Sequence, residues 1–184
     1  MTIGFTTPQN DADLHQILAL QQANQKQNID TETAKSQGFV TVVHDFDLLK
    51  KMNEAAPQVI AKDGDKVVGY ALVMPESFSA LIPVLTPMFE MLATLSFRGI
   101  PIKDRPFYAM GQICVAEGYR GFGVFDGLYQ HHKALYASTY DVIATEISVS
   151  NARSMKAHQR VGFETIHTFK DATDDWNIVA WDWR

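Results

Sequence analysis

The sequence predicts an α/β protein of one domain, and three observations support this. The chain has 184 residues, close to the usual length of a single domain. Hydrophobic residues make up 46% and charged residues 20%, which is typical of a globular protein and excludes a disordered or collagen-like chain. The second half alternates strand and helix patterns. At least one pair of strands joined by a helix can therefore be parallel.

In the first half we expect, in order, an edge strand over 2–7, a helix over 12–25, a polar loop over 26–36, an extended piece over 38–43, a helix over 45–55, and strands over 58–62 and 66–74. Asn10 or Asp11 is placed to cap the first helix. Asp63-Gly64-Asp65 lies between the two apolar runs, and an Asp-Gly pair in that position indicates a hairpin.

The connection over 75–106 contains an apolar stretch, Phe78 to Phe97, that is nearly long enough to span a bilayer. Pro83, Pro87 and Glu90 interrupt it, so we expect no membrane span. The prolines instead predict separate helical pieces over 77–82 and 87–97.

The second half begins with a strand over 107–115 that we expect to be buried on both faces. It is followed by a glycine-rich turn over 117–123, a helix over 124–138, a strand over 142–149, a helix over 152–161, and strands over 164–170 and 178–183.

Charge and cysteine content exclude several classes of protein. The net charge is −5 and no Lys/Arg cluster is present, so we expect no nucleic-acid partner. The start of the chain lacks the basic and apolar regions of a signal peptide. Cys114 is the only cysteine, so no internal disulfide can form, and a cytoplasmic location is the simplest expectation.

The first motif with chemical meaning is Arg120-Gly121-Phe122-Gly123-Val124, which lies between a predicted buried strand and a helix. Glycines leave backbone N–H groups accessible, and a helix N-terminus adds positive partial charge, so this pattern suits a phosphate group. A glycine-rich turn without a ligand is the alternative interpretation.

The second motif lies about thirty residues later. The motif Thr145 to Asn151 begins within the predicted strand over 142–149 and ends at an Asn. A helix over 152–161 follows, and Gly162-Phe163 comes directly after that helix. Glycine in this position is typical of a helix C-terminus.

Together the two motifs resemble the GNAT superfamily of N-acetyltransferases. Arg120 and Gly123 match two fixed positions of that family's pyrophosphate loop, and the later block matches at Glu146, Asn151, Gly162 and Phe163. The resemblance implies a single acetyltransferase domain over 1–184 with a mixed, mostly antiparallel sheet of six or seven strands flanked by helices. The connection would then be a helical insert over 76–105 before the fourth strand.

The resemblance also implies a co-substrate, acetyl-CoA, and no metal. The residues that it places against the cofactor are Ile113, Cys114, Val115, Arg120, Gly121, Phe122, Gly123, Val124, Phe125, Asn151, Arg153 and Lys156. Phe125 departs from the family, which usually has Gly or Ala there, so its side chain must point away from the pyrophosphate. Cys114 lies in an apolar strand and is expected to be a packed core thiol rather than a nucleophile.

For catalysis, Glu146 matches a glutamate that serves as the base in family members acting on protein N-termini. A strand carboxylate paired with a cation is the alternative. His158 replaces the family's tyrosine and could protonate the leaving thiolate if its charged form is stabilised. The alternative is a half-exposed helix histidine.

The predicted function is transfer of an acetyl group from acetyl-CoA to a primary amine of a small molecule or peptide, by direct attack on the thioester. The alternative is an inactive CoA-binding or self-associating module on the same fold. No membrane partner is expected, and a homodimer is possible. In the insert, Met88, Phe89, Met91, Leu92 and Leu95 fall on one helical stripe. That stripe could line the acceptor site, pair across a dimer, or pack on the chain's own core.

Overall fold

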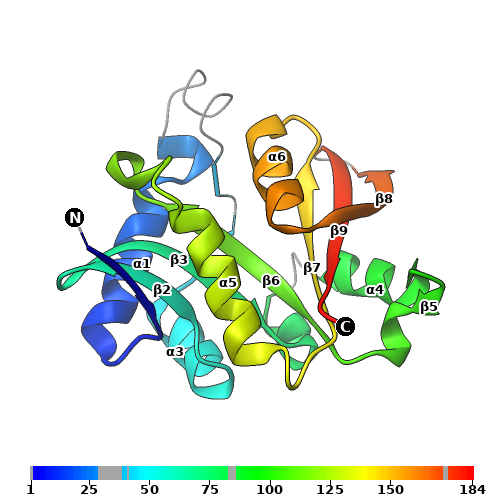
Figure 1. Cartoon of the computed structure of the whole chain (residues 1–184), viewed down its shortest axis with the longest axis horizontal. Coiled ribbons are helices and arrows are strands. Elements are labelled where there is room, and N and C mark those ends of the chain that lie inside the picture. The colour runs from blue at the N-terminus through cyan, green and yellow to red at the C-terminus, as the bar shows by residue number, and fades with distance from the viewer. Residues whose placement is uncertain (1, 29–38, 41, 83–85, 172–173) are drawn as a thin grey trace. The chain divides into compact units, whose positions relative to one another are not determined.

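The computed structural model describes residues 2–28, 39–40, 42–82, 86–171 and 174–184. Seven strands form a hydrogen-bonded sheet in the order β1-β2-β3-β6-β7-β9-β8 (Figure 1). The pairing of β6 with β7 is parallel, whereas those of β1–β2, β2–β3, β7–β9 and β8–β9 are antiparallel. The predicted mixed α/β sheet is therefore confirmed. The chain divides into two compact units, residues 1–73 with 111–135, and residues 74–110 with 136–184.

The first unit contains the predicted edge strand and hairpin. β1 (Ile3–Thr6) pairs with β2 (Val59–Asp63), which pairs with β3 (Lys66–Met74). Gly64 at the hairpin turn has φ +59°, a left-handed conformation that glycine adopts at no steric cost. The C-terminal part of β6 (Phe107–Val115), from residue 111 onward, also belongs to this unit.

In the described part of this unit, the strands are accompanied by helices α1 (Asp11–Ala23), α3 (Phe46–Ala55) and α5 (Val124–Tyr136), with short 3-10 turns at Lys26–Asn28 and Glu117–Tyr119. Side chains of β3 alternate between the two faces. A Cβ on Gly69 would touch Val124 and Leu128, so α5 packs closely against that face. Tyr70 points to the other face, where its hydroxyl joins a polar cluster with α1.

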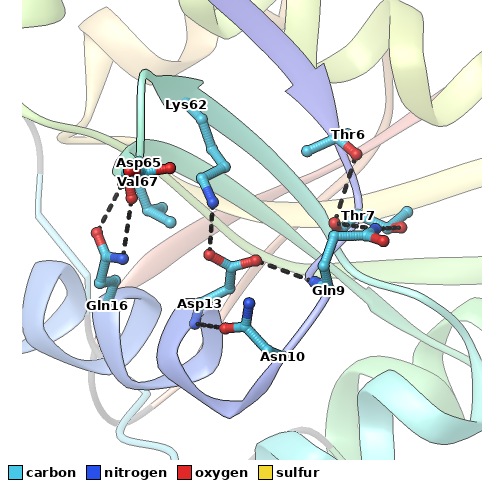
Figure 2. A network of polar contacts seen from close by, with 9 residues as sticks. All are labelled: Thr6, Thr7, Gln9, Asn10, Asp13, Gln16, Lys62, Asp65 and Val67. Carbon is cyan, nitrogen blue, oxygen red and sulfur yellow. Dashed lines mark hydrogen bonds and ion pairs between the residues drawn. The ribbon is translucent and has the colours of Figure 1, made fainter.

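Polar contacts fix the start of α1 against the hairpin (Figure 2). As predicted, Asn10 is the N-cap, and its Oδ1 accepts a hydrogen bond from the N–H of Asp13. Asp13 forms an ion pair of 2.8 Å with Lys62 of β2. Gln16 bonds both Asp65 and Val67 across the hairpin end. The pKa of Asp13 is lowered because the Gln9 N–H and Lys62 outweigh the opposing effect of burial.

A second polar cluster lies between α1, β3 and β6. Gln21 Nε2 donates to His44 Nδ1 and to Gln112 Oε1, each at 2.8 Å. Tyr70 also donates to Gln112 Oε1, and Gln112 Nε2 donates to the carbonyl of Val42. These buried bonds fix the side chain of Gln112 on β6 and the segment before α3.

The second unit contains β7 (Val142–Ser148), α6 (Ala152–Val161), β8 (Glu164–Lys170) and β9 (Asp175–Asp182). α6 and β8 have the predicted bounds, whereas β7 ends one residue earlier than predicted and β9 spans 175–182 instead of 178–183. Asn177 contacts Met155 and Trp181 packs beside Gly162 and Phe163, so the odd-numbered side chains of β9 face α6. The even-numbered side chains face the other way.

The insert belongs to the second unit, and its structure corrects the predicted helix over 87–97. A 3-10 helix (Glu76–Leu81) is followed by α4 (Thr86–Thr94), which ends three residues early. The chain then forms a small hairpin of β4 (Ser96–Phe97) and β5 (Ile100–Pro101), and a 3-10 turn at Ile102–Asp104. Arg98 and Gly99 both have positive φ, as a tight hairpin turn requires. No helix in the described part of the chain is long and apolar enough to span a bilayer.

Candidate functional site

The turn between β6 and α5 has the backbone that the first motif predicts. Gly121 has φ +86° and Gly123 has φ +77°, a backbone conformation that favours glycine at both positions. All residues from Gly121 to Gly123 are exposed, and a Cβ built on either glycine meets no atom within 4 Å. The turn therefore presents open backbone beside the first turn of a helix, a site that an anionic group can approach.

Arg120 supports this turn. Its Nε donates to the carbonyl of Val115 at 3.0 Å, and its guanidinium donates to Asn24 Oδ1 at 2.7 Å. Asn24 is the C-cap of α1, so the arginine connects the end of β6 with the end of that helix. Arg120 was expected to supply charge to a phosphate, and the structure shows that it also fixes the shape of the turn.

The phenylalanines of the turn point in different directions. The ring of Phe125 packs edge-on against Tyr129 one helical turn later, with centroids 5.2 Å apart. The ring therefore packs along its own helix, and its direction relative to a bound pyrophosphate stays a prediction. Phe122 is 65% exposed, which is unusual for so large an apolar side chain.

In β6, Cys114 is a buried thiol, and burial raises its pKa to about 12. At neutral pH it is protonated and a poor nucleophile, as the sequence predicts for a core cysteine. Ile113 and Val115, on either side, are half-buried. The carbonyl of Val115 already accepts the hydrogen bond from Arg120. The expected backbone contacts of Ile113 to Val115 with a cofactor stay a prediction.

Glu146 is a carboxyl group with a strongly perturbed pKa in the second unit. It lies on β7 opposite Ile178 of β9, on the even-numbered face that points away from α6. Burial, and secondarily the charge of Asp171, raises its pKa from 4.5 to about 7. No hydrogen bond or ion pair reaches its carboxyl group from the residues that the structure describes. The alternative of a carboxylate paired with a neighbouring cation is thus not supported.

His158 lies in a different environment from the one that an acid role requires. It is 1% exposed on α6, and its ring packs against Phe163. Its Nδ1 is 2.8 Å from the carbonyl of Ser154, which can only accept, so Nδ1 carries the proton of the neutral ring. Burial lowers the pKa of His158 to about 4. The charged form is therefore destabilised, contrary to the condition stated for the acid role.

At the start of α6, Asn151 is the N-cap, and its Oδ1 accepts from the N–H of Ser154 at 3.1 Å. Any contact of its side chain with a cofactor would therefore come from the amide nitrogen. Arg153 and Lys156 are exposed on the first turns of this helix. They provide positive charge near its N-terminus.

Sequence reasoning overlooked two features. Asp171 contributes to the high pKa of Glu146 although it lies 25 residues away in the chain. The cluster around Gln112 joins residues up to 91 positions apart, and no local pattern indicates it. Among the described residues, no group of three His, Cys, Asp or Glu side chains is arranged to hold a metal ion.

Comparison with known proteins adds the following. The family model described as acetyltransferase (GNAT) family matches residues 20–163. No curated protein sequence matches the chain. Among solved structures, the NatC complex bound to Gag peptide and CoA aligns at TM-score 0.68 and 14% identity, covering all of both chains.

Two bacterial structures are also similar. YncA of Salmonella typhimurium, solved with acetyl-CoA, aligns at TM-score 0.63 and 15% identity, covering 100% of this chain and 95% of the other. The ribosomal-protein-S18-alanine N-acetyltransferase of Escherichia coli aligns at TM-score 0.63 and 12% identity, with coverage of 98% and 94%. At these identities the structural similarity shows a common fold.

Proposed function

Because the chain belongs to the GNAT family of acetyltransferases, we propose that it transfers an acetyl group from acetyl-CoA to a primary amine. The family uses acetyl-CoA as co-substrate and requires no metal. The observation that carries the choice of an amine is Glu146, a half-buried carboxyl group whose pKa is raised to about 7. A base with a pKa near the working pH combines a useful ionised fraction with the ability to take a proton.

The chemistry requires such a base. An alkylammonium group has a pKa of about 10.4 and cannot attack a thioester until it loses a proton. Glu146 would accept that proton directly or through a water molecule. The neutral nitrogen then forms a bond to the thioester carbonyl carbon, the carbon–sulfur bond breaks, and the nitrogen loses its second proton as the amide forms. CoA leaves as a thiolate, which takes up that proton directly or through water. A thiol has a pKa of about 8.5, so the thiolate is readily protonated near neutral pH.

The cofactor contacts in this proposal follow the predicted residues. The amides from Gly121 to Phe125 would hold the pyrophosphate, because the turn is open and two of its glycines have left-handed backbone. The backbone of Ile113 to Val115 would pair with the pantetheine arm. Asn151, Arg153 and Lys156 would contribute an amide and two positive charges.

His158 is better explained as a packing residue than as the acid. To donate a proton it would have to be charged, and its pKa of about 4 leaves it almost entirely neutral at pH 7. Replacement of His158 by Phe is expected to keep the shape of the pH–rate profile. Loss of a falling limb at high pH in that variant would restore the acid role.

The direct test is release of free thiol from acetyl-CoA in the presence of a panel of primary amines, which includes alkylamines, polyamines, amino acids and peptides with free N-termini. We expect release that depends on the amine and is lost in Glu146→Gln. CoA binding by calorimetry without thiol release for any amine would contradict the proposal and favour a binding module.

A further inference from the structure

The face of the second unit that carries Glu146 also carries a tryptophan. In the register of β7 with β9, Glu146 lies opposite Ile178, and Ser148 lies opposite Trp176. The two pairs are separated by one residue along each strand, so all four side chains project from the same face, away from α6. Glu146 and Trp176 are therefore diagonal neighbours, about 7–8 Å apart, a distance that long and aromatic side chains can bridge.

The indole nitrogen of Trp176 is a buried donor without a partner. Its Nε1 is shielded from solvent and makes no hydrogen bond within the described part of the chain. The two residues directly opposite do not supply an acceptor. On β7, Ser148 Oγ is 2.6 Å from both Ser150 Oγ and Asp174 Oδ2. On β8, the side chain of Phe169 contains no oxygen or nitrogen. Buried N–H groups are nearly always bonded in native proteins, so this one requires an explanation.

Glu146 is the complementary group. Among the described residues, no hydrogen bond or ion pair reaches its carboxyl group. Both Glu146 and Trp176 are half-buried, so solvent reaches this part of the face. The face thus places a carboxyl group that can take a proton beside an N–H group that lacks an acceptor. A molecule that satisfies both has an amine and, close to it, an oxygen with a free lone pair.

The charges around this pair favour one kind of oxygen. Asp171 contributes to the raised pKa of Glu146, and Asp174 bonds the serine that lies opposite Trp176. These carboxylates would repel a ligand carboxylate, whereas they do not repel a neutral carbonyl group. In an α-amino amide the amine nitrogen and the carbonyl oxygen are separated by two carbon atoms. The N-terminal residue of a peptide has this arrangement. A free amino acid carries a carboxylate there, and an alkylamine has no oxygen.

We propose that Trp176 recognises the acceptor by donating its indole N–H to the carbonyl oxygen next to the reacting amine, and that the acceptor is an α-amino amide such as a peptide N-terminus. This inference rests on the proposed acetyl transfer and specifies its acceptor. Glu146 takes the ammonium proton, and Trp176 orients the amine by holding the adjacent carbonyl group. An acceptor without that oxygen leaves the buried N–H unsatisfied and therefore binds less well.

The first test compares three primary amines of equal size with acetyl-CoA at saturation: alaninamide, alanine and 3-methylbutan-2-amine. They carry a neutral carbonyl group, a carboxylate and no oxygen, respectively. With kcat/KM calculated on the concentration of neutral amine, the wild type should prefer alaninamide to both of the others. In Trp176→Phe, which keeps an aromatic ring but lacks the N–H, kcat/KM for alaninamide should fall about three- to tenfold relative to that for 3-methylbutan-2-amine.

Trp183→Phe is the matched control. Its Nε1 is also buried without a partner among the described residues, but Trp183 follows the other end of β9. The relative preference for alaninamide should therefore be unchanged in this variant. An equal relative loss in Trp183→Phe would overturn the inference, as would an unchanged preference in Trp176→Phe or a wild type that prefers alanine.

A second measurement separates this inference from the proposed function. The chain has three tryptophans, so its ¹H–¹⁵N spectrum contains three indole N–H signals, and the two variants identify those of Trp176 and Trp183. Addition of alaninamide to the protein with CoA should move the Trp176 signal downfield and leave the Trp183 signal in place, because a hydrogen-bonded N–H is deshielded. That shift without thiol release from acetyl-CoA would overturn the transfer reaction and support the recognition. Thiol release without the shift would overturn the recognition alone.

Discussion

The turn over 120–125 and the strand that carries Glu146 differ in how far their polar groups are exposed to solvent. The glycines of the turn are exposed and have left-handed backbone. Arg120 stabilises the turn through its hydrogen bond to the carbonyl of Val115. Glu146 is half-buried on a sheet face, where burial and the charge of Asp171 raise its pKa. Open backbone dipoles suit binding of an anion, and a partly desolvated carboxyl group suits proton transfer. We therefore expect the turn to determine the affinity for the cofactor and Glu146 to take part in proton transfer.

Glu146→Gln should have the largest effect, and we expect it on kcat rather than on the affinity for acetyl-CoA. The amide keeps the size of the side chain but cannot accept the proton of the amine, so kcat should fall by roughly 10²- to 10⁴-fold. The affinity for acetyl-CoA, measured by calorimetry, should stay within twofold. A large loss of affinity with unchanged kcat would assign Glu146 to binding instead.

The same residue predicts a pH effect on stability. A carboxyl group whose pKa is raised on folding binds its proton more tightly in the folded state. The wild type should therefore lose stability as the pH rises from about 4.5 through about 7. Glu146→Gln should lack this loss, so urea unfolding at pH 5 and pH 8 would distinguish the two proteins. Equal pH dependence in both would show that Glu146 has an ordinary pKa.

Arg105→Met tests how the insert residues 86–105 are attached to β9. Removal of Arg105 breaks a buried ion pair and, among the described residues, leaves Asp182 with only one cation, Arg98, 4.0 Å away. Loss of one partner of a buried pair typically costs about 3–5 kcal/mol of stability, and the remaining cation should keep the loss at the lower end of that range. Lys170→Gln is the control, because Lys170 and Asp175 are both exposed, their ion pair does not involve Asp182, and it should contribute little. Urea unfolding should therefore show a much larger decrease for Arg105→Met. Equal losses of stability in the two variants would mean that the buried ion pair does not attach residues 86–105 to β9.

Much of this organisation follows from local sequence patterns. α6 agrees with prediction at both ends, because an Asn cap and a C-terminal glycine mark them. The hairpin at Gly64 and the turn at Gly121 and Gly123 are similar cases, in which backbone geometry restricts the residue type. Glu146 was predicted as the base from its place in a family motif, and that role stays a prediction.

The features that sequence reasoning did not find depend on tertiary packing. The β4–β5 hairpin lies in an apolar stretch that also fits a helix, and only its Arg-Gly turn distinguishes the two. The pair of Arg105 with Asp182 joins residues 77 positions apart. The burial of His158 depends on Phe163 and the sheet beneath α6, whereas the helix pattern alone allows exposure.

Gly123→Ala tests whether the turn binds the pyrophosphate of acetyl-CoA. With φ at +77°, a Cβ costs about 1–2 kcal/mol, and the turn must relax to relieve it. We expect acetyl-CoA to bind about tenfold more weakly, which corresponds to about 1.4 kcal/mol, with kcat at saturation nearly unchanged. Gly118→Ala is the control, since Gly118 lies in the same connection and has no left-handed backbone. Unchanged acetyl-CoA affinity in a folded Gly123→Ala protein would contradict the placement of the pyrophosphate.

Asp171→Asn should produce the smallest effect and tests the second cause of the Glu146 shift. Burial is the main cause, so removal of the Asp171 charge should lower the pKa of Glu146 without returning it to the ordinary carboxyl range. The acidic limb of kcat should move to lower pH, because Glu146 then stays ionised in more acidic solution. Asp175→Asn is the control, because Asp175 is exposed and paired with Lys170. If the limb moves equally in both variants, the general charge of this surface, rather than Asp171, tunes the base. If it moves in neither, the limb does not report Glu146.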